Sequence, residues 1–207
     1  MSAIETVLFD WGGVIQQTVD RAPREALAAE VGRRPNELEA AVFGHALWNL
    51  ASVGGLSAER LWASICLDLG WPEERAPELV SRFFAGDQQD QEIIARIEAL
   101  RAEGTPVALL SNAPPPYGPA GRAGQWGCSA VFDDQIFSFE LGVQKPDVRA
   151  FRGALAKLGW RPKRTLFIDD AAANVAAARR LGMAAIHYSG TGALIDSLWR
   201  LDLPHQA

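Results

Sequence analysis

The sequence has few of the residues that mark a disulfide-stabilised or zinc-binding protein. Its 207 residues include two cysteines, Cys66 and Cys128, and three histidines, His45, His187 and His205. The cysteines form no CxxC pair, and the histidines lie far apart and match no metal-ligand spacing. These absences argue against a disulfide framework and against a structural zinc site.

Long apolar stretches and runs of basic residues are also missing. No segment approaches the roughly 20 apolar residues that a transmembrane helix needs, and the first residues show no signal-peptide pattern. We therefore expect a cytoplasmic protein with no membrane partner. The formal net charge is −5 and no Lys/Arg run occurs, which argues against nucleic acid as a partner. The sequence leaves the oligomeric state uncertain.

The chain does contain short apolar runs that are typical of buried parallel strands. These runs are nearly continuous rather than alternating, as in strands that helices cover on both faces. They lie at Thr6–Phe9, Pro106–Leu110, Gln135–Ser138, Thr165–Ile168 and Ala184–Tyr188. Amphipathic helical segments lie between them and end at Gly104, Gly159 and Gly182. This alternation predicts an α/β fold with a doubly wound parallel sheet.

Residues 16–86 break the alternation. They show helical patterns interrupted by prolines and glycines, with no good strand. The segment is too long for a simple crossover between strands, so we interpret it as an inserted α-helical cap subdomain. The predicted division is a core of residues 1–15 plus 87–207 and a cap of residues 16–86.

Polar residues follow the predicted strands, at the edge where open α/β sheets bind ligands. Taken singly, each is compatible with a turn or a helix cap, and their consistent position after successive strands is what indicates a site. They are Asp10, Ser111, Asn112, Lys145, Asp169 and Asp170.

The electrostatics of these residues favour a bound cation. Two carboxylates about 4 Å apart repel by roughly 4 kcal/mol at an effective dielectric near 20, and Lys145 offsets only part of this. Mg²⁺ with oxygen ligands would offset the rest. Protonation of one aspartate is the alternative, and we favour the metal.

Four segments carry a resemblance to a known family. LFDWGGV at residues 8–14, LLSN at 109–112, QKP at 144–146 and FIDD at 167–170 resemble the four motifs of the haloacid dehalogenase superfamily. The resemblance runs from Thr6 to Gly182, and the helical insertion occupies the place where many members carry a cap. It implies a Rossmann-like core and a Mg²⁺-dependent phosphatase that acts on a small phosphorylated metabolite.

The resemblance also implies roles for individual residues. Asp10 would attack phosphorus and form an aspartyl-phosphate. Mg²⁺ would be held by the Asp10 carboxylate, the main-chain carbonyl of Gly12, and one or both of Asp169 and Asp170.

The phosphate would be bound by groups from the second and third motifs. The resemblance implies hydrogen bonds from Ser111 and Asn112 to its oxygens, and a point charge from Lys145 near both the phosphoryl group and the nucleophile. We add Trp11, which follows Asp10 directly, as a candidate substrate-binding residue.

Gly12 departs from the family pattern, because phosphatases of this superfamily usually carry a general-acid aspartate at that position. General acid catalysis is typically worth about 10²–10⁴-fold. The absence is compatible with a slow phosphatase, with an acid supplied elsewhere, or with a leaving group that needs little protonation, such as a sugar 1-phosphate or an acyl phosphate. A phosphate-ligand-binding protein with little turnover is an alternative, and a 2-haloacid dehalogenase is another.

Substrate specificity is expected to come from the cap, which would cover the site and exclude water. Candidate lining residues are Trp11, Trp48, Asn49 and Tyr117. Gln16 and Gln17 are candidate hinge residues between the core and the cap.

Overall fold

The computed structural model describes residues 4–117 and 131–200, with side chains described up to residue 198, so Cys128 and His205 lie outside the described residues. The described core elements are β1 (Thr6–Phe9), α6 (Gln91–Ala102), β4 (Val107–Ser111), β5 (Asp134–Phe137), α8 (Ser138–Leu141), α9 (Val148–Leu158), η2 (Pro162–Arg164), β6 (Thr165–Asp169), α10 (Ala172–Arg180), β7 (Ala184–His187) and α11 (Thr191–Arg200). Between β1 and α6 lie β2 (Gln16–Thr18), α1 (Ala22–Glu30), α2 (Pro35–Phe43), α3 (Trp48–Ser52), α4 (Ala58–Asp68), η1 (Glu73–Arg75), α5 (Ala76–Phe83) and β3 (Asp87–Gln89).

Five strands form one parallel sheet in the order β5-β4-β1-β6-β7. The first strand of the chain is therefore central, and Val7 pairs with Val107 on one side and Leu166 on the other. The chain builds β4 and β5 on one side of β1 and then crosses to build β6 and β7 on the other. This confirms the predicted doubly wound sheet.

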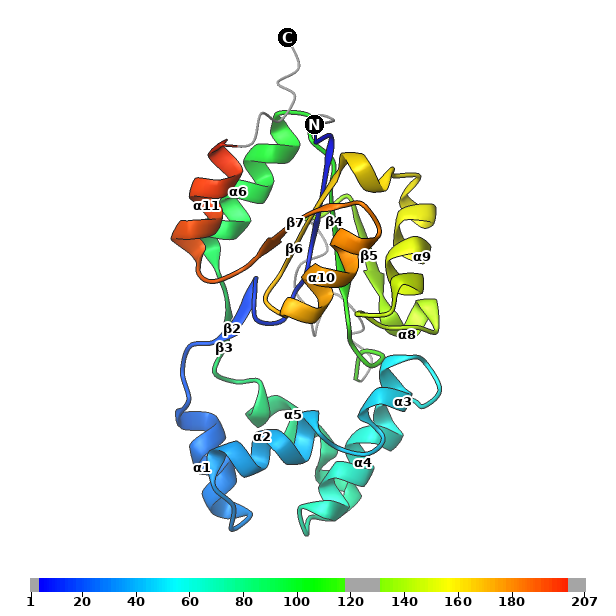
Figure 1. The fold of residues 1–207 in the computed structure, drawn as a ribbon. Coiled ribbons are helices and arrows are strands. Elements are labelled where there is room, and N and C mark those ends of the chain that lie inside the picture. The colour runs from blue at the N-terminus through cyan, green and yellow to red at the C-terminus, as the bar shows by residue number, and fades with distance from the viewer. Residues whose placement is uncertain (1–3, 118–130, 201–207) are drawn as a thin grey trace.

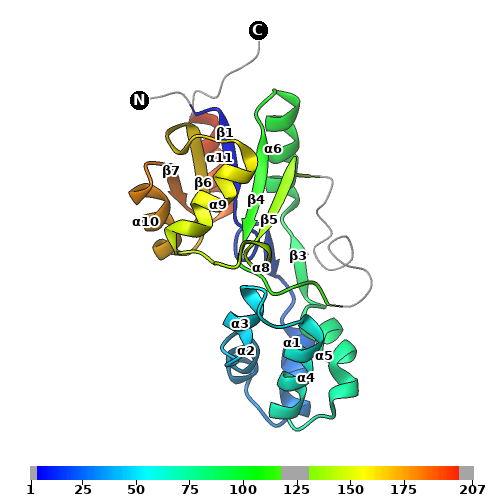
Figure 2. The ribbon, with the colours of Figure 1, turned by 90° about the vertical axis from the view of Figure 1, so that its right-hand side faces the viewer.

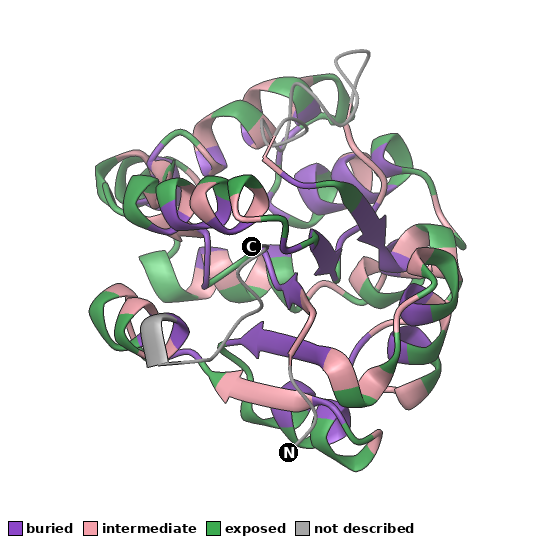
Figure 3. Cartoon of the chain, turned by 90° about the horizontal axis from the view of Figure 1, so that it is seen from above, coloured by how far each residue is buried: buried purple, intermediate pink, exposed green. Residues whose placement is uncertain are grey.

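Helices cover both faces of the sheet, with α6 and α11 on one face and α9 and α10 on the other (Figure 1). The strand residues alternate between two apolar cores: Val7 and Phe9 pack with residues of α6 and α11, whereas Leu8 packs with residues of α9 and α10. Full burial of such a side chain stabilises the fold by about 1.5–3 kcal/mol. The strands β1, β4 and β6 are almost entirely buried, and the edge strand β7 is only half-buried (Figure 3).

A short antiparallel ribbon joins the sheet to the inserted helices (Figure 2). In it β2 pairs with β3, with Gln16 opposite Gln89 and Thr18 opposite Asp87. The prediction that residues 16–86 contain no strand is therefore wrong at their first residues. The ribbon strands are three polar residues long, which leaves no apolar pattern for sequence analysis to detect.

The helices α1 to α5 form a separate layer beyond the carboxyl ends of the strands (Figure 1). They enclose an apolar core of their own, built largely from Leu27, Leu38, Leu61, Trp62 and Phe83. We call these helices the cap. The exact division into a core of residues 1–15 plus 87–207 and a cap of residues 16–86 stays a prediction. Within the described ranges, no helix is long and apolar enough to cross a membrane.

Asp87 links the core, the ribbon and the cap. The indole N–H of Trp11 donates to Oε1 of Gln16 at 2.7 Å, and Nε2 of Gln16 donates to Oδ2 of Asp87 at 3.0 Å. The other Asp87 oxygen, Oδ1, accepts from Thr18 at 2.8 Å and from the buried guanidinium of Arg24 at 2.8 Å. The orientation of the cap is thus coupled to the loop that follows β1.

Asp87→Ala should lower the free energy of unfolding by about 3–5 kcal/mol, because it leaves the buried Arg24 without one of its anionic partners. Urea denaturation followed by tryptophan fluorescence measures this. The matched control is Asp196→Ala on the exposed side of α11, which should stay within about 0.5 kcal/mol of the wild type. Equal effects of the two substitutions would contradict the assignment of Asp87 as the link.

Candidate active site

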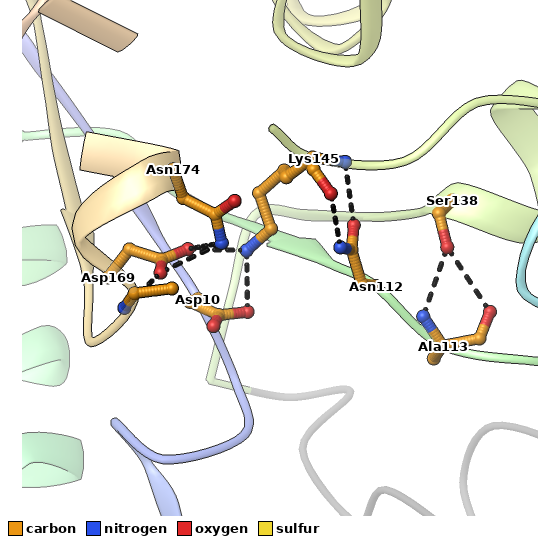
Figure 4. Close-up of polar contacts among 8 residues, drawn as sticks. Asp10, Asn112, Ala113, Ser138, Lys145, Asp169 and Asn174 are labelled. Carbon is orange, nitrogen blue, oxygen red and sulfur yellow. Dashed lines mark hydrogen bonds and ion pairs between the residues drawn. The ribbon is translucent and has the colours of Figure 1, made fainter. Parts of the chain in front are cut away.

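Three neighbouring strands deliver polar residues to one edge of the sheet. Asp10 follows β1, Ser111 ends β4 and Asp169 ends β6, and β1 lies between the other two strands. Lys145 comes from the loop between α8 and α9 and points into the space between the two aspartates (Figure 4). The site therefore forms where the direction of chain winding changes, the usual place for ligands in such sheets.

The buried ammonium of Lys145 bridges two carboxylates. Its Nζ lies 2.7 Å from Oδ1 of Asp10 and 2.7 Å from Oδ2 of Asp169. The backbone of Lys145 is held by the side chain of Asn112, whose Nδ2 donates to the Lys145 carbonyl at 2.8 Å and whose Oδ1 accepts from its N–H at 2.9 Å. The Asn112 amide thus positions Lys145, and its contact with a phosphate stays a prediction.

Asn174 is the site residue to which the sequence analysis assigned no role. Its Nδ2 lies 3.0 Å from each carboxylate oxygen of Asp169. Oδ1 of Asp169 also accepts from the backbone N–H of Ala171 at 2.8 Å. Asn174 lies in the first turn of α10, five residues after Asp169, and this spacing is the signal that could have identified it.

Asp170 differs from Asp169 in being exposed, and it lies against Gly13. A Cβ atom added to Gly13 would lie 2.2 Å from Oδ2 of Asp170, and the φ angle of Gly13 is +79°. The left-handed backbone therefore favours glycine here, and a larger residue would also displace the Asp170 carboxylate.

The three carboxylates form a group that fits a divalent cation. One carboxylate oxygen from each of Asp10, Asp169 and Asp170 lies within 4.8 Å of the others. With all groups ionised, one ammonium faces three carboxylates, so negative charge is in excess. A hard cation with oxygen ligands matches this set of groups in charge and in ligand type.

Burial and charge raise the pKa of two of these carboxyl groups. Desolvation raises the pKa of Asp10 to about 7, with a further contribution from the charge of Asp169, although Lys145 acts in the opposite direction. Desolvation and the charge of Asp169 also raise the pKa of Asp170 above its usual value. Carboxylates in this state gain from a cation that favours their charged form.

A cavity of about 750 Å³ opens above the cluster and reaches the cap. The predicted site residues that line it are Asp10, Trp11, Gly12, Ser111, Asn112, Lys145 and Asp170. Trp11 is buried and packs in the core beneath α6, and its indole N–H is bonded to Gln16.

The predicted specificity residues are placed differently from one another. Trp48 lines the cavity, and so do Gln16 and Gln17 of the ribbon. Asn49 instead accepts a hydrogen bond from Gln144 at 3.2 Å, and Tyr117 packs against the apolar core of the cap. Among the described lining residues, neither Asn49 nor Tyr117 occurs.

Comparisons with known proteins agree with this geometry. The family model described as haloacid dehalogenase-like hydrolase matches residues 4–182. Phosphoserine phosphatase from Thermus thermophilus is 32% identical, over 80% of this chain and 72% of that protein. Phosphoglycolate phosphatase from Yersinia pestis is 29% identical, over 89% of this chain and 80% of that protein.

A solved structure is similar in fold. The HAD family enzyme from Bacteroides thetaiotaomicron, crystallised in complex with magnesium and inorganic phosphate, superimposes with a TM-score of 0.70. The match covers 89% of this chain and 93% of that chain at 20% identity.

Cation binding at the cluster should weaken about tenfold for each pH unit below 7, because a proton on Asp10 competes with the cation. Calorimetric titration with MgCl₂ at pH 6, in buffers of different ionisation enthalpy, should show proton release. Asp10→Asn should remove the Asp10 part of that release. An affinity that stays constant between pH 5 and 8 would contradict the raised pKa.

Proposed function

Because this chain belongs to the haloacid dehalogenase-like hydrolase family, we propose that it is a Mg²⁺-dependent phosphatase that hydrolyses small phosphomonoesters through Asp10. The observation that carries the proposal is the convergence of Asp10, Asp169 and Asp170 around the ammonium of Lys145. The phosphatase relatives in Thermus and Yersinia support this reaction class.

The proposed metal ligands are the carboxylates of Asp10 and Asp170 and the main-chain carbonyl of Gly12. Asp170 is favoured over Asp169 as a direct ligand, since both oxygens of Asp169 already accept from Lys145, Asn174 or the Ala171 backbone. When bound, Mg²⁺ would supply positive charge that offsets the repulsion between these carboxylates and the incoming phosphate.

In the proposed reaction the Asp10 carboxylate attacks phosphorus, the bond from phosphorus to the ester oxygen breaks, and the leaving oxygen takes a proton from solvent. Lys145 favours the charged form of Asp10 and stabilises the negative charge on the phosphoryl oxygens. Water then attacks the phosphorus of the aspartyl-phosphate, which releases phosphate and restores the carboxylate. The proposed role of Ser111 is to donate a hydrogen bond to the phosphoryl group from the end of β4.

Gly12 supports one second candidate, a phosphate-binding protein with little turnover. The residue has no side chain to protonate the leaving group, and a general acid typically raises the reaction rate by about 10²–10⁴-fold. The dehalogenase alternative is weaker, since a reaction at carbon has no use for the excess of carboxylates at this site. Chloride release from 2-chloropropionate that is insensitive to EDTA would favour it.

Asp10→Asn should lower phosphate release from acetyl phosphate by at least about 10³-fold, because the amide cannot act as the nucleophile. Phosphate release with 5 mM MgCl₂ measures this, and addition of EDTA to the wild type should have a similar effect. A cooperative thermal unfolding transition shows that the variant is folded. A folded Asp10→Asn variant that keeps its turnover would remove Asp10 from the nucleophile role.

Gly12→Asp should raise the turnover of alkyl phosphates by about 10²-fold or more, because it supplies the missing acid. A Cβ at this position would meet no atom within 4 Å, so the start of a side chain fits there without a clash. Gly12→Asn is the matched control, equal in size but unable to donate a carboxyl proton, and it should give no gain. A folded Gly12→Asp variant with unchanged kcat would contradict this account of Gly12.

A further inference from the structure

The cap end of the cavity is lined by aromatic side chains. Phe43, Trp48, Trp62 and Phe84 all contribute to its wall. They form one continuous group: the ring centroids of Phe43 and Trp48 are 5.2 Å apart, those of Trp48 and Trp62 are 6.1 Å apart, and those of Trp62 and Phe84 are 5.9 Å apart, each in an edge-on arrangement. We call these four residues the aromatic wall.

Arg24, the buried cation near the aromatic wall, is already paired. Arg24 contacts Glu39 at 3.0 Å and Asp87 at 2.8 Å, and its Nε donates to the Phe83 carbonyl at 2.9 Å. Arg21 is the other cap cation among the described lining residues, and it is exposed at the rim. Among the described residues, the cap end of the cavity therefore presents no buried, unpaired cation to the carboxylate of a substrate such as phosphoserine or phosphoglycolate.

One member of the wall has free contact surface. Phe43 is 46% exposed although it belongs to the wall. A flat ring packed against Phe43 would cover this apolar surface.

The lack of an acidic side chain at Gly12 favours the same kind of ligand. A phenolic hydroxyl has a pKa of about 10, as in tyrosine, whereas the pKa of an aliphatic alcohol is far higher, close to that of water. A phenolate therefore leaves with its electron pair without needing a proton from residue 12. An aliphatic alkoxide does need one.

We propose that the substrate is an aryl phosphate, whose aromatic ring packs against the aromatic wall and leaves as a phenolate. This inference rests on the proposed phosphatase function and narrows its substrate class. In the step concerned, the Asp10 carboxylate forms the new bond to phosphorus and the P–O(aryl) bond breaks. The phenolate then takes a proton from solvent.

The test compares phenyl phosphate, cyclohexyl phosphate and acetyl phosphate with Mg²⁺ present. The first two share the size of the ring and differ in aromaticity and leaving group, and acetyl phosphate has no ring. For the wild type, kcat/KM should be at least about 10²-fold higher for phenyl phosphate than for cyclohexyl phosphate. Gly12→Asp should lower this ratio, because the added acid protonates the cyclohexyl leaving group.

Phe43→Ser tests the wall itself. It should raise KM for phenyl phosphate roughly 2- to 12-fold and leave the kinetics of acetyl phosphate unchanged. The control is Leu67→Ser, since Leu67 is 62% exposed and lies outside the cavity lining. If Phe43→Ser fails to fold, the binding of two phosphonates to the wild type is measured instead by tryptophan fluorescence. Phenylphosphonate should bind more tightly than ethylphosphonate.

The outcomes separate the two proposals. Absence of phosphate release from all three esters would end the phosphatase proposal and this inference with it. Release from acetyl phosphate, with phenyl phosphate no better than cyclohexyl phosphate and with no selective effect of Phe43→Ser, would overturn the aryl phosphate inference alone. Equal binding of the two phosphonates would also overturn it.

Discussion

The Lys145 ammonium lies 2.7 Å from both Asp10 and Asp169, and the rest of the site depends on this buried ion triad. A buried charge is tolerated only when it is paired and hydrogen-bonded, and the loss of one partner leaves the others exposed to a large desolvation cost. The triad still carries an excess of negative charge once Asp170 is included. This excess favours the proposed cation at the edge of the sheet, and the cation would in turn offset the repulsion of an anionic substrate.

The triad also explains why two asparagines are needed beside it. Lys145 stands on a loop, and loops do not hold a side chain as firmly as strands do. Asn112 supplies the rigidity by bonding both the N–H and the carbonyl of Lys145, and it does so from the end of a buried strand. Asn174 holds Asp169 in place from the first turn of α10, where its Nδ2 donates to both carboxylate oxygens. Lys145 and Asp169 are thus oriented by hydrogen bonds from neighbouring asparagine side chains.

Sequence patterns predicted the sheet and the polar residues that the structure brings together at its carboxyl edge, because both follow from local signals. A buried strand is a continuous apolar run, and a polar residue at its end stands out. The ribbon of β2 and β3 was missed, since its six residues are polar and show no apolar pattern. The Asn112 and Asn174 contacts were not foreseen for a similar reason: an amide can face a ligand or a neighbour, and spacing alone does not separate the two. The aromatic wall depends on how five helices pack, which no local pattern encodes.

The ribbon has an architectural consequence. The N–H groups of Val19 and Asp20 both donate to the carbonyl of Gly86 at 3.0 Å, so the chain enters and leaves the cap at a single point. A segment whose two ends meet in this way contributes little to the register of the sheet. The entropic cost of closing the segment into a loop also grows only slowly with the number of residues in it. The helices between residues 20 and 86 are therefore exchangeable in principle: another insert with adjoining ends would leave β1, α6 and the catalytic edge where they are. Chemistry and selectivity can then change independently of each other within one chain.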